Sequence, residues 1–128
     1  MEKRLQFYSK GKLQDIYLPT MRRVKAKKRG TYLLLPSGEL LECPFSISYI
    51  WQIVQHFGFV KAQKSYLLNP KAVTNVFHKH HHYALLDDGR SIYITAQAYT
   101  ILKIYLEKRE NPKPILPPKN GFSPLFFN

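Results

Sequence analysis

The sequence predicts a mostly β fold of the α+β class, with small antiparallel sheets, a short amphipathic helix in the middle and a second helix near the C-terminus. Three observations lead to this prediction. Short apolar stretches flank compact turn signals, Pro-Ser-Gly at 36–38 and Asp-Asp-Gly-Arg at 87–90, as in β-hairpins. Apolar residues recur at helical spacing within 44–57 and again after Thr95. Hydrophobic residues make up 45% of the 128, enough for one real core in a single domain.

Three β-hairpins are expected, each formed by two apolar segments on either side of a turn. The last is the clearest, because its Asp-Asp-Gly-Arg tip suits a tight turn between two short strands. A further strand is expected at 72–79, after Pro70. The segments expected to pair are 5–8 with 13–18, 31–35 with 40–43, and 83–86 with 91–94.

Both expected helices have suitable capping residues. In the first, 44–57, Ser46 or Ser48 can cap the start and Gly58 suits the C-terminal end. Thr95 can cap the start of the second. An apolar stripe on a helix is typical of core packing rather than of a cofactor site. The stripes comprise Ile47, Ile50, Trp51, Val54 and Phe57 in the first helix, and residues among Tyr99, Leu102, Ile104, Tyr105 and Leu106 in the second.

The stretch 59–69, FVKAQKSYLLN, places a polar centre between apolar anchors. Neither face of a continuous strand would be purely apolar here, so we expect a break at 63–65 before the apolar pattern resumes. Such a break would hold Gln63, Lys64 and Ser65 rigidly at the surface. An ordinary strand–turn–strand unit is the alternative explanation of the same pattern.

The chain is expected to divide into a domain, residues 1–110, and a Pro-rich tail, residues 111–128. The second helix should fade near Arg109, because the prolines that follow Asn111 cannot continue it. The end of the tail, GFSPLFFN, is rich in aromatic residues. Since free apolar ends are unusual in soluble proteins, we expect the tail to dock on the domain or on a protein partner.

Positive charge dominates the composition. The chain has 20 Lys and Arg against 8 Asp and Glu, a formal net charge of +12. This imbalance points to a polyanionic partner, either nucleic acid or an anionic membrane surface, although a soluble protein can also be basic without one. Mutual repulsion makes a cluster of cations costly unless counter-ions or phosphates lie nearby. The densest cluster, which contains no acid, consists of Arg22, Arg23, Lys25, Lys27, Lys28 and Arg29.

The sequence argues against a membrane protein, a secreted protein and an enzyme. Its longest apolar run is far shorter than the roughly 20 residues of a membrane helix, and the amino terminus, MEKRLQFYSK, lacks the apolar stretch of a signal peptide. The single cysteine, Cys43, fits the cytoplasm and should be a small buried hydrophobe. No paired-carboxylate, Ser-His-Asp or Cys-His arrangement stands out, so we expect no catalytic residue and no cofactor.

Four histidines crowd into a short segment: His78, His80, His81 and His82. A metal site would need two or more imidazoles to converge, with further ligands. No second set of Cys, Asp or Glu lies nearby in the sequence, so we expect no metal. We interpret the segment as a solvent-exposed loop that can touch phosphates when its histidines are protonated.

The order of these elements resembles the LytTR DNA-binding family over about residues 5–108. The family has a pattern like F-x-R-x-H-x-S-Y-L-x-N, followed by a strand G-x-x-I-x-[VI]-[ST]. Upstream, two strands, a basic loop, a hairpin and a helix occupy the family's places. We expect no receiver domain, which is common in relatives, ahead of this part. The matching positions are Phe59, Lys61, Gln63, Ser65, Tyr66, Leu67 and Asn69, then Gly89, Ile92, Ile94 and Thr95.

The resemblance implies a DNA-binding domain whose loops, rather than a helix, enter successive major grooves. Gln63 stands where histidine is usual and Gln97 where a basic residue is usual. Base readout is therefore expected to differ, because glutamine prefers the paired edge of adenine whereas arginine prefers guanine. The positions that carry over are Lys28 or Arg29 in the basic loop, Gln63, Lys64 and Ser65 in the polar kink, and Gln97 in the turn after the last strand.

We therefore expect a cytoplasmic, bacterial transcription regulator, a response-regulator-like effector domain that binds double-stranded DNA sequence-specifically. Phosphate contacts are expected from the cluster 22–29 with Lys61 and Lys64, and base contacts from Arg29, Gln63, Lys64 and Gln97. A homodimer on DNA and a protein partner for the tail are compatible with this hypothesis. The alternatives are a protein-interaction module of the same fold that uses the aromatic tail, and charge-driven binding to RNA or a membrane surface.

Overall fold

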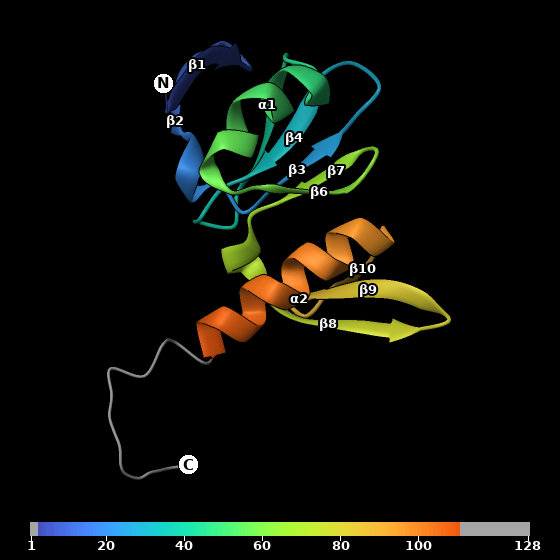
Figure 1. Cartoon of the computed structure of the whole chain (residues 1–128). Helices are drawn as coiled ribbons and strands as arrows, with labels where there is room; N and C mark the ends of the chain where they lie inside the picture. Colours follow the sequence, from blue (N-terminus) through green and yellow to red (C-terminus); the bar gives the residue numbers. More distant parts are fainter. Residues whose placement is uncertain (1–2, 111–128) are drawn as a thin grey trace, which may run out of the picture.

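The computed structural model describes residues 3–110, and within them ten strands and two α-helices are joined by short turns and 3-10 helices. Figure 1 shows their arrangement in space. The elements are β1 (Arg4–Ser9), β2 (Lys12–Tyr17), η1 (Leu18–Thr20), β3 (Arg23–Ala26), β4 (Thr31–Leu34), β5 (Leu40–Cys43), α1 (Ile47–Val54), η2 (Gln55–Phe57), β6 (Val60–Gln63), β7 (Tyr66–Leu68), η3 (Pro70–Ala72), β8 (Val73–Lys79), β9 (His81–Leu86), β10 (Ser91–Ile94) and α2 (Ala96–Glu110).

The strands form three small antiparallel sheets, which confirms the predicted fold class. A five-stranded sheet has the order β5-β4-β3-β7-β6, a three-stranded sheet has the order β10-β9-β8, and β1 pairs with β2. All three expected hairpins are present, formed by β1 with β2, β4 with β5 and β9 with β10. The strand expected at 72–79 is also present, as β8.

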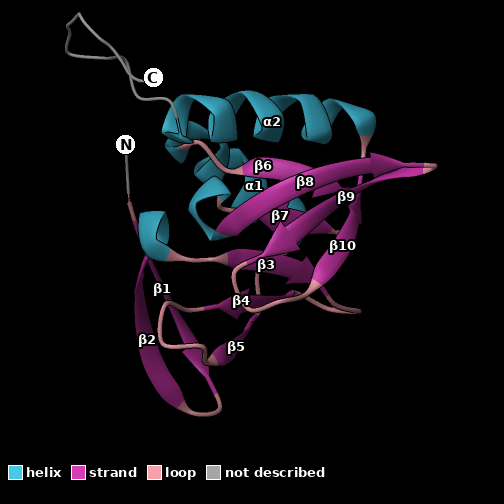
Figure 2. Ribbon diagram, turned by 90° about the horizontal axis from the view of Figure 1, so that it is seen from below, coloured by secondary structure: helices cyan, strands magenta, loops and turns pink. Residues whose placement is uncertain are grey.

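The five-stranded sheet lies between two hydrophobic cores. Successive side chains of a strand point to opposite faces, so that in β7 Leu67 joins the core that contains Ile50 of α1, whereas Leu68 joins the core that contains Leu102 of α2. Figure 1 shows α1 above this sheet and α2 below it. Helix α2 packs against β6, β8 and β9, and Figure 2 shows it along one side of the molecule.

Local signals in the sequence place both helices where the structure has them. The Ser46 hydroxyl accepts a hydrogen bond from the backbone N–H of Tyr49 at 3.2 Å, so that Ser46 is the cap. Gly58 ends η2 with φ at 86°, the left-handed conformation that glycine adopts without strain. The Thr95 hydroxyl accepts from the N–H of Ala98 at 3.0 Å at the start of α2.

Only the end of the segment 22–29 forms the basic loop that the resemblance implies, and Lys28 and Arg29 lie in it. Residues 23–26 form β3, the central strand of the five-stranded sheet, which pairs with β4 on one side and β7 on the other. Val24 is fully buried between them. Cations alternate with the apolar residues of this strand, and only one apolar residue is fully buried. An alternation this short does not indicate a strand in the sequence.

The histidine segment is a hairpin rather than a loop. Strand β8 runs to Lys79 and β9 begins at His81, so that His80 alone connects them, with φ at 66°. His78 therefore lies directly opposite His82 in the ladder. Within residues 3–110 no group of three or more His, Cys, Asp or Glu side chains is arranged to hold a metal ion.

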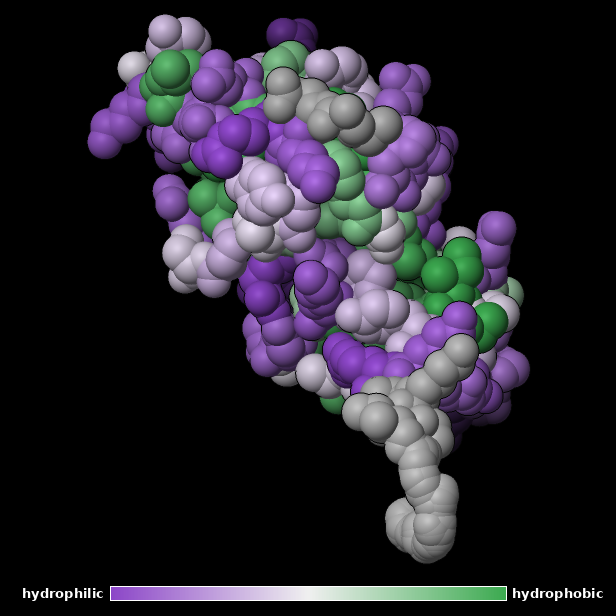
Figure 3. All heavy atoms as spheres, turned by 60° about the vertical axis from the view of Figure 1, so that its left-hand side comes forward, coloured by the Kyte–Doolittle hydropathy of each residue, from purple (hydrophilic) through white to green (hydrophobic). Residues whose placement is uncertain are grey.

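Cys43 is buried in the first core, as expected, and burial raises the pKa of its thiol. Among the helices of residues 3–110, none is long and apolar enough to cross a membrane. The predicted Pro-rich tail, residues 111–128, lies outside the described residues. Hydrophilic side chains predominate on the face shown in Figure 3, with apolar side chains gathered in a few places between them.

Candidate nucleic-acid interface

Three segments that are distant in the sequence come together on one side of the molecule: the β3–β4 loop (27–30), the β6–β7 turn (64–65) and the start of α2. The backbone N–H of Ala26 donates to the carbonyl of Ser65 at 2.9 Å, which ties the loop to the turn. The N–H of Thr95 donates to the carbonyl of Ala62 at 2.9 Å, which ties the start of α2 to β6. In Figure 1 this side is on the right.

The β3–β4 loop presents exposed cations on a rigid backbone. Lys28 and Arg29 are exposed, and the N–H of Lys27 closes the loop by donating to the carbonyl of Gly30 at 3.1 Å. Gly30 has φ at 95°, and a Cβ atom added there would lie 2.2 Å from the carbonyl oxygen of Cys43. Only glycine therefore fits this position, which fixes the loop against the start of the segment that leads to α1.

Lys27 differs from its neighbours because it is paired. Its Nζ lies 2.7 Å from Oε1 of Glu42 on β5 and 5.3 Å from the centre of the Tyr32 ring. The hydrogen bond between the two side chains raises the pKa of Lys27 and lowers that of Glu42. The charge of Lys27 is thus largely matched within the domain, and less of it is available to a polyanion.

The β6–β7 turn follows the expected break in the strand. The register shifts between Lys61 and Gln63, a bulge that re-aims the end of the strand. Lys64 and Ser65 are exposed at the tip, as expected. Lys61 of β6 is also exposed. Its side chain is on the side of the sheet that α1 covers, with its Nζ 5.8 Å from the centre of the Trp51 ring.

Gln63 does not project freely as the sequence suggests. Its side-chain Nε2 donates to the carbonyl of Tyr93 on β10 at 2.7 Å. This bond joins the edge of the five-stranded sheet to the three-stranded sheet, so Gln63 has a structural role. One amide N–H and the side-chain oxygen stay available for other partners.

Arg22 and Arg23 belong to the same basic run as the loop, yet they bind acids of the β9–β10 turn. The guanidinium of Arg22 pairs with Asp87, and Nη2 of Arg23 lies 3.4 Å from Oδ2 of Asp88. The side chain of Arg23 is only 9% exposed. These two arginines fasten the second half of the domain to β3, whereas Lys25, the next cation of β3, is exposed.

Gln97 lies in the first turn of α2 rather than in the turn that precedes it, and it is exposed. Backbone N–H groups at the start of a helix carry partial positive charge, which favours a nearby anion. The predicted position is therefore at the surface, on the same side as the β3–β4 loop and the β6–β7 turn.

An aromatic ladder on the β8–β10 sheet was not recognised from the sequence. The rings of His78 and His82 stack with their centres 4.2 Å apart. The ring centre of Tyr99 on α2 lies 4.8 Å from that of His82. On β10, Tyr93 lies 5.0 Å from Tyr83 and is 59% exposed. No signal in the sequence reveals the ladder, because it depends on the one-residue turn at His80, with φ at 66°, which places 78 and 82 opposite each other.

Comparison with known proteins identifies the fold. No protein-family model and no curated protein matches the sequence. Among solved structures, the chain is similar to the LytTr DNA-binding domain of a Bacillus cereus protein described as a methyl-accepting/DNA response regulator, with a TM-score of 0.65 and 13% sequence identity. The match covers 84% of this chain and 98% of that domain. The predicted LytTR-like fold is thereby confirmed.

Proposed function

We propose that this protein binds double-stranded DNA through the side of the domain formed by the β3–β4 loop, the β6–β7 turn and the start of α2. The observation that carries the proposal is the gathering of exposed cations from separate segments on this side. They are not matched by acids among residues 3–110. Three of these cations, Lys28, Arg29 and Lys64, lie in the loop and the turn, and we add Lys61 from β6, whose side chain lies beside Trp51 of α1.

The similar solved domain is described as DNA-binding, which supports DNA as the polyanion. The local geometry supports it as well. Short loops held on a rigid sheet can enter a major groove, where each base pair presents a distinct set of donors and acceptors. In an RNA duplex the major groove is too deep and narrow for such loops, so the same geometry disfavours RNA.

The proposed contacts fall into two groups. Lys28, Arg29, Lys61 and Lys64 bind phosphates and set the register of the domain on the duplex. Arg29, Lys64 and Gln97 also reach base edges, and Gln63 uses the part of its amide that Tyr93 leaves available. By this proposal the protein recognises a particular sequence and acts as a transcription regulator in the bacterial cytoplasm.

A salt titration tests the proposal. Each neutralised phosphate contributes about −0.9 to the slope of log K against log salt on B-DNA, so four cations predict a slope of about −4. The measurement is fluorescence anisotropy of a labelled duplex that the full-length protein has selected from a random pool. An RNA duplex of the same sequence is the control and should bind more weakly. A slope near zero, or equal affinity for the RNA, would contradict the proposal.

A further inference from the structure

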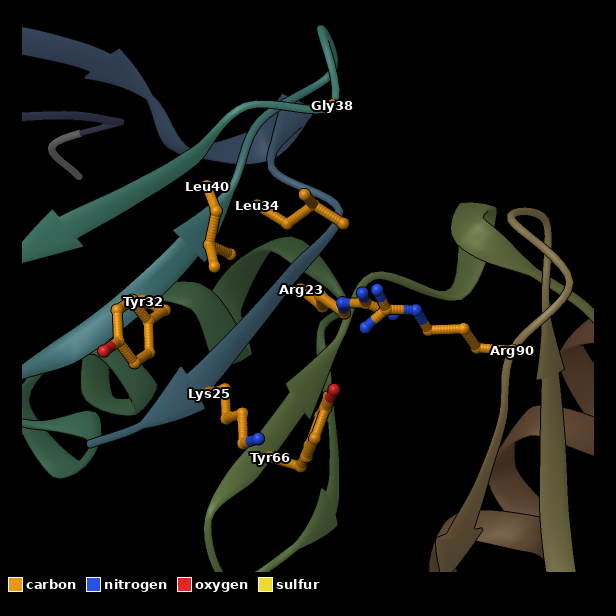
Figure 4. A pocket seen from close by; sticks show the side chains of 8 residues that line it. All are labelled: Arg23, Lys25, Tyr32, Leu34, Gly38, Leu40, Tyr66 and Arg90. Carbon is orange, nitrogen blue, oxygen red and sulfur yellow. The ribbon is translucent and has the colours of Figure 1, made fainter.

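A hollow lies on the face of the five-stranded sheet that α2 covers only in part. The β6 and β7 end of this face packs into the second core through Val60 and Leu68, whereas the part over β3, β4 and β5 is open. The open part and the β9–β10 turn enclose a cavity of about 250 Å³. Its main lining side chains are Arg23, Lys25, Tyr32, Leu40, Tyr66 and Arg90, shown in Figure 4.

The hollow carries an excess of positive charge. Arg23 and Arg90 come from opposite sides, and their guanidinium groups point toward each other in Figure 4. Both lie near one carboxylate, that of Asp88, with Nη2 of Arg23 at 3.4 Å and Nε of Arg90 at 3.8 Å. Lys25 adds a third cation to the lining and has no ion pair within residues 3–110. Three cations therefore face a single acid.

Arg23 also has a donor without an acceptor. Its side chain is only 9% exposed, and its Nη1 is buried with no hydrogen-bond partner among the described residues. Leaving a charged donor buried and unsatisfied is costly, more so than for a neutral group. Because Arg90 is 69% exposed, it can turn outward and admit a ligand to the Arg23 guanidinium.

The shape and the walls of the hollow specify the kind of anion. A guanidinium group presents its N–H donors in a planar fork that matches the two oxygens of a carboxylate. The rings of Tyr32 and Tyr66 and the side chain of Leu40 supply apolar walls. A volume of about 250 Å³ suits a ring-sized molecule. We propose that this hollow binds a small organic acid, with the carboxylate on Arg23 and Arg90 and the apolar body against Leu34, Leu40 and the tyrosine rings on either side of Lys25.

Titration of the ¹⁵N-labelled full-length protein with benzoate, followed by NMR, tests this inference. Benzoate should shift the backbone amide signals of β3, β4 and β7 in a saturable manner. Benzyl alcohol has the same ring without the charge, and inorganic phosphate has the charge without the ring. Both should bind at least tenfold more weakly than benzoate, because each lacks one half of the recognition.

Variants assign the binding to the hollow. Arg90→Gln should weaken benzoate binding about tenfold, as expected for the loss of a hydrogen bond to a charged group. Arg90 is exposed, so this variant should fold even where Arg23→Gln does not. Lys108→Gln, the same charge change at an exposed position near the end of α2, should leave binding unchanged.

Four results would overturn the proposal. Equal binding of benzoate and benzyl alcohol would show a merely apolar cavity. Phosphate bound as tightly as benzoate would show a general anion site without the apolar part. Equal affinity of Arg90→Gln and the unmodified protein, or shifts scattered outside β3, β4 and β7, would place the binding elsewhere. None of these outcomes depends on DNA binding.

Discussion

The two ends of one basic run have opposite environments. Arg22 and Arg23, at the start of β3, bind Asp87 and Asp88 of a distant turn. Lys28 and Arg29 lie a few residues further along, exposed in the β3–β4 loop, and pair with no acid of residues 3–110. The first pair clamps the domain together, whereas the second is available to a partner. A net charge therefore overstates the number of cations that a polyanion can reach.

The largest effect on stability is expected for the ion pairs that Arg22 and Arg23 form with Asp87 and Asp88. Arg23→Ala should lower the free energy of unfolding by about 2 kcal/mol. Breaking a buried pair costs roughly 3–5 kcal/mol, and the 40% exposure of the Asp88 side chain reduces that cost. Urea unfolding measures it, with Lys25→Ala as the exposed control on the same strand. Equal stability of the two variants would show that the ion pair of Arg23 with Asp88 does not stabilise the domain.

The double variant Lys28→Ala/Arg29→Ala should instead weaken DNA binding and leave stability unchanged. Removing two phosphate contacts should make the salt slope of DNA binding less negative by about 2 and weaken binding roughly tenfold at ordinary ionic strength. Stability should stay within about 0.5 kcal/mol, because both side chains are exposed. Lys108→Ala, far along α2, is the charge control. An unchanged slope would remove the loop from the interface.

Gln63 combines the properties of the paired arginines and of the exposed loop cations. It is hydrogen-bonded within the domain, and it also lies close to the proposed interface. Gln63→Ala should cost about 1 kcal/mol of stability through loss of the bond to Tyr93. It should also lower affinity for the selected duplex more than for a random one. Gln6→Ala, the same change at an exposed position of β1, serves as the control. A variant that loses affinity for both duplexes equally would assign Gln63 a structural role alone.

The smallest effect is expected for the half-buried pair of Lys27 and Glu42, because Lys27 lies next to the exposed loop cations yet is paired with an acid. Glu42→Gln should release Lys27 and slightly strengthen binding to any duplex. The folded-state pKa of Glu42 is lowered, so the pair stabilises the domain above the unfolded pKa of glutamate, about 4.3, and this contribution is lost as the pH falls through the folded-state pKa.

The raised pKa of Lys27 has the complementary consequence: its contribution is present below the unfolded pKa of lysine and is lost as the pH rises through the folded value. Unfolding of the unmodified protein and of Glu42→Gln should therefore differ most near neutral pH and converge in acid. A difference that persists at pH 2 would show that another interaction of Glu42 is responsible.

Most of the fold follows from signals between residues that are neighbours in the chain. The turn at 36–38, the cap at Ser46 and the break after Gln63 were all predictable, because turn geometry and helix capping depend on a few consecutive residues. Strand β3 was not predictable in this way. Its alternation is masked by cations, and its burial depends on pairing with β4 and β7, which come later in the chain.

By itself, the sequence determined three of the hairpins and their order, the two helices and the excess of positive charge, because these depend on composition and local pattern. Only the tertiary structure decided which charges are free. Arg23 is buried because Asp88 meets it from the β9–β10 turn, and Gln63 is anchored because Tyr93 lies beside it. Partners so distant in the chain are brought together by packing of the whole domain, which no local pattern encodes.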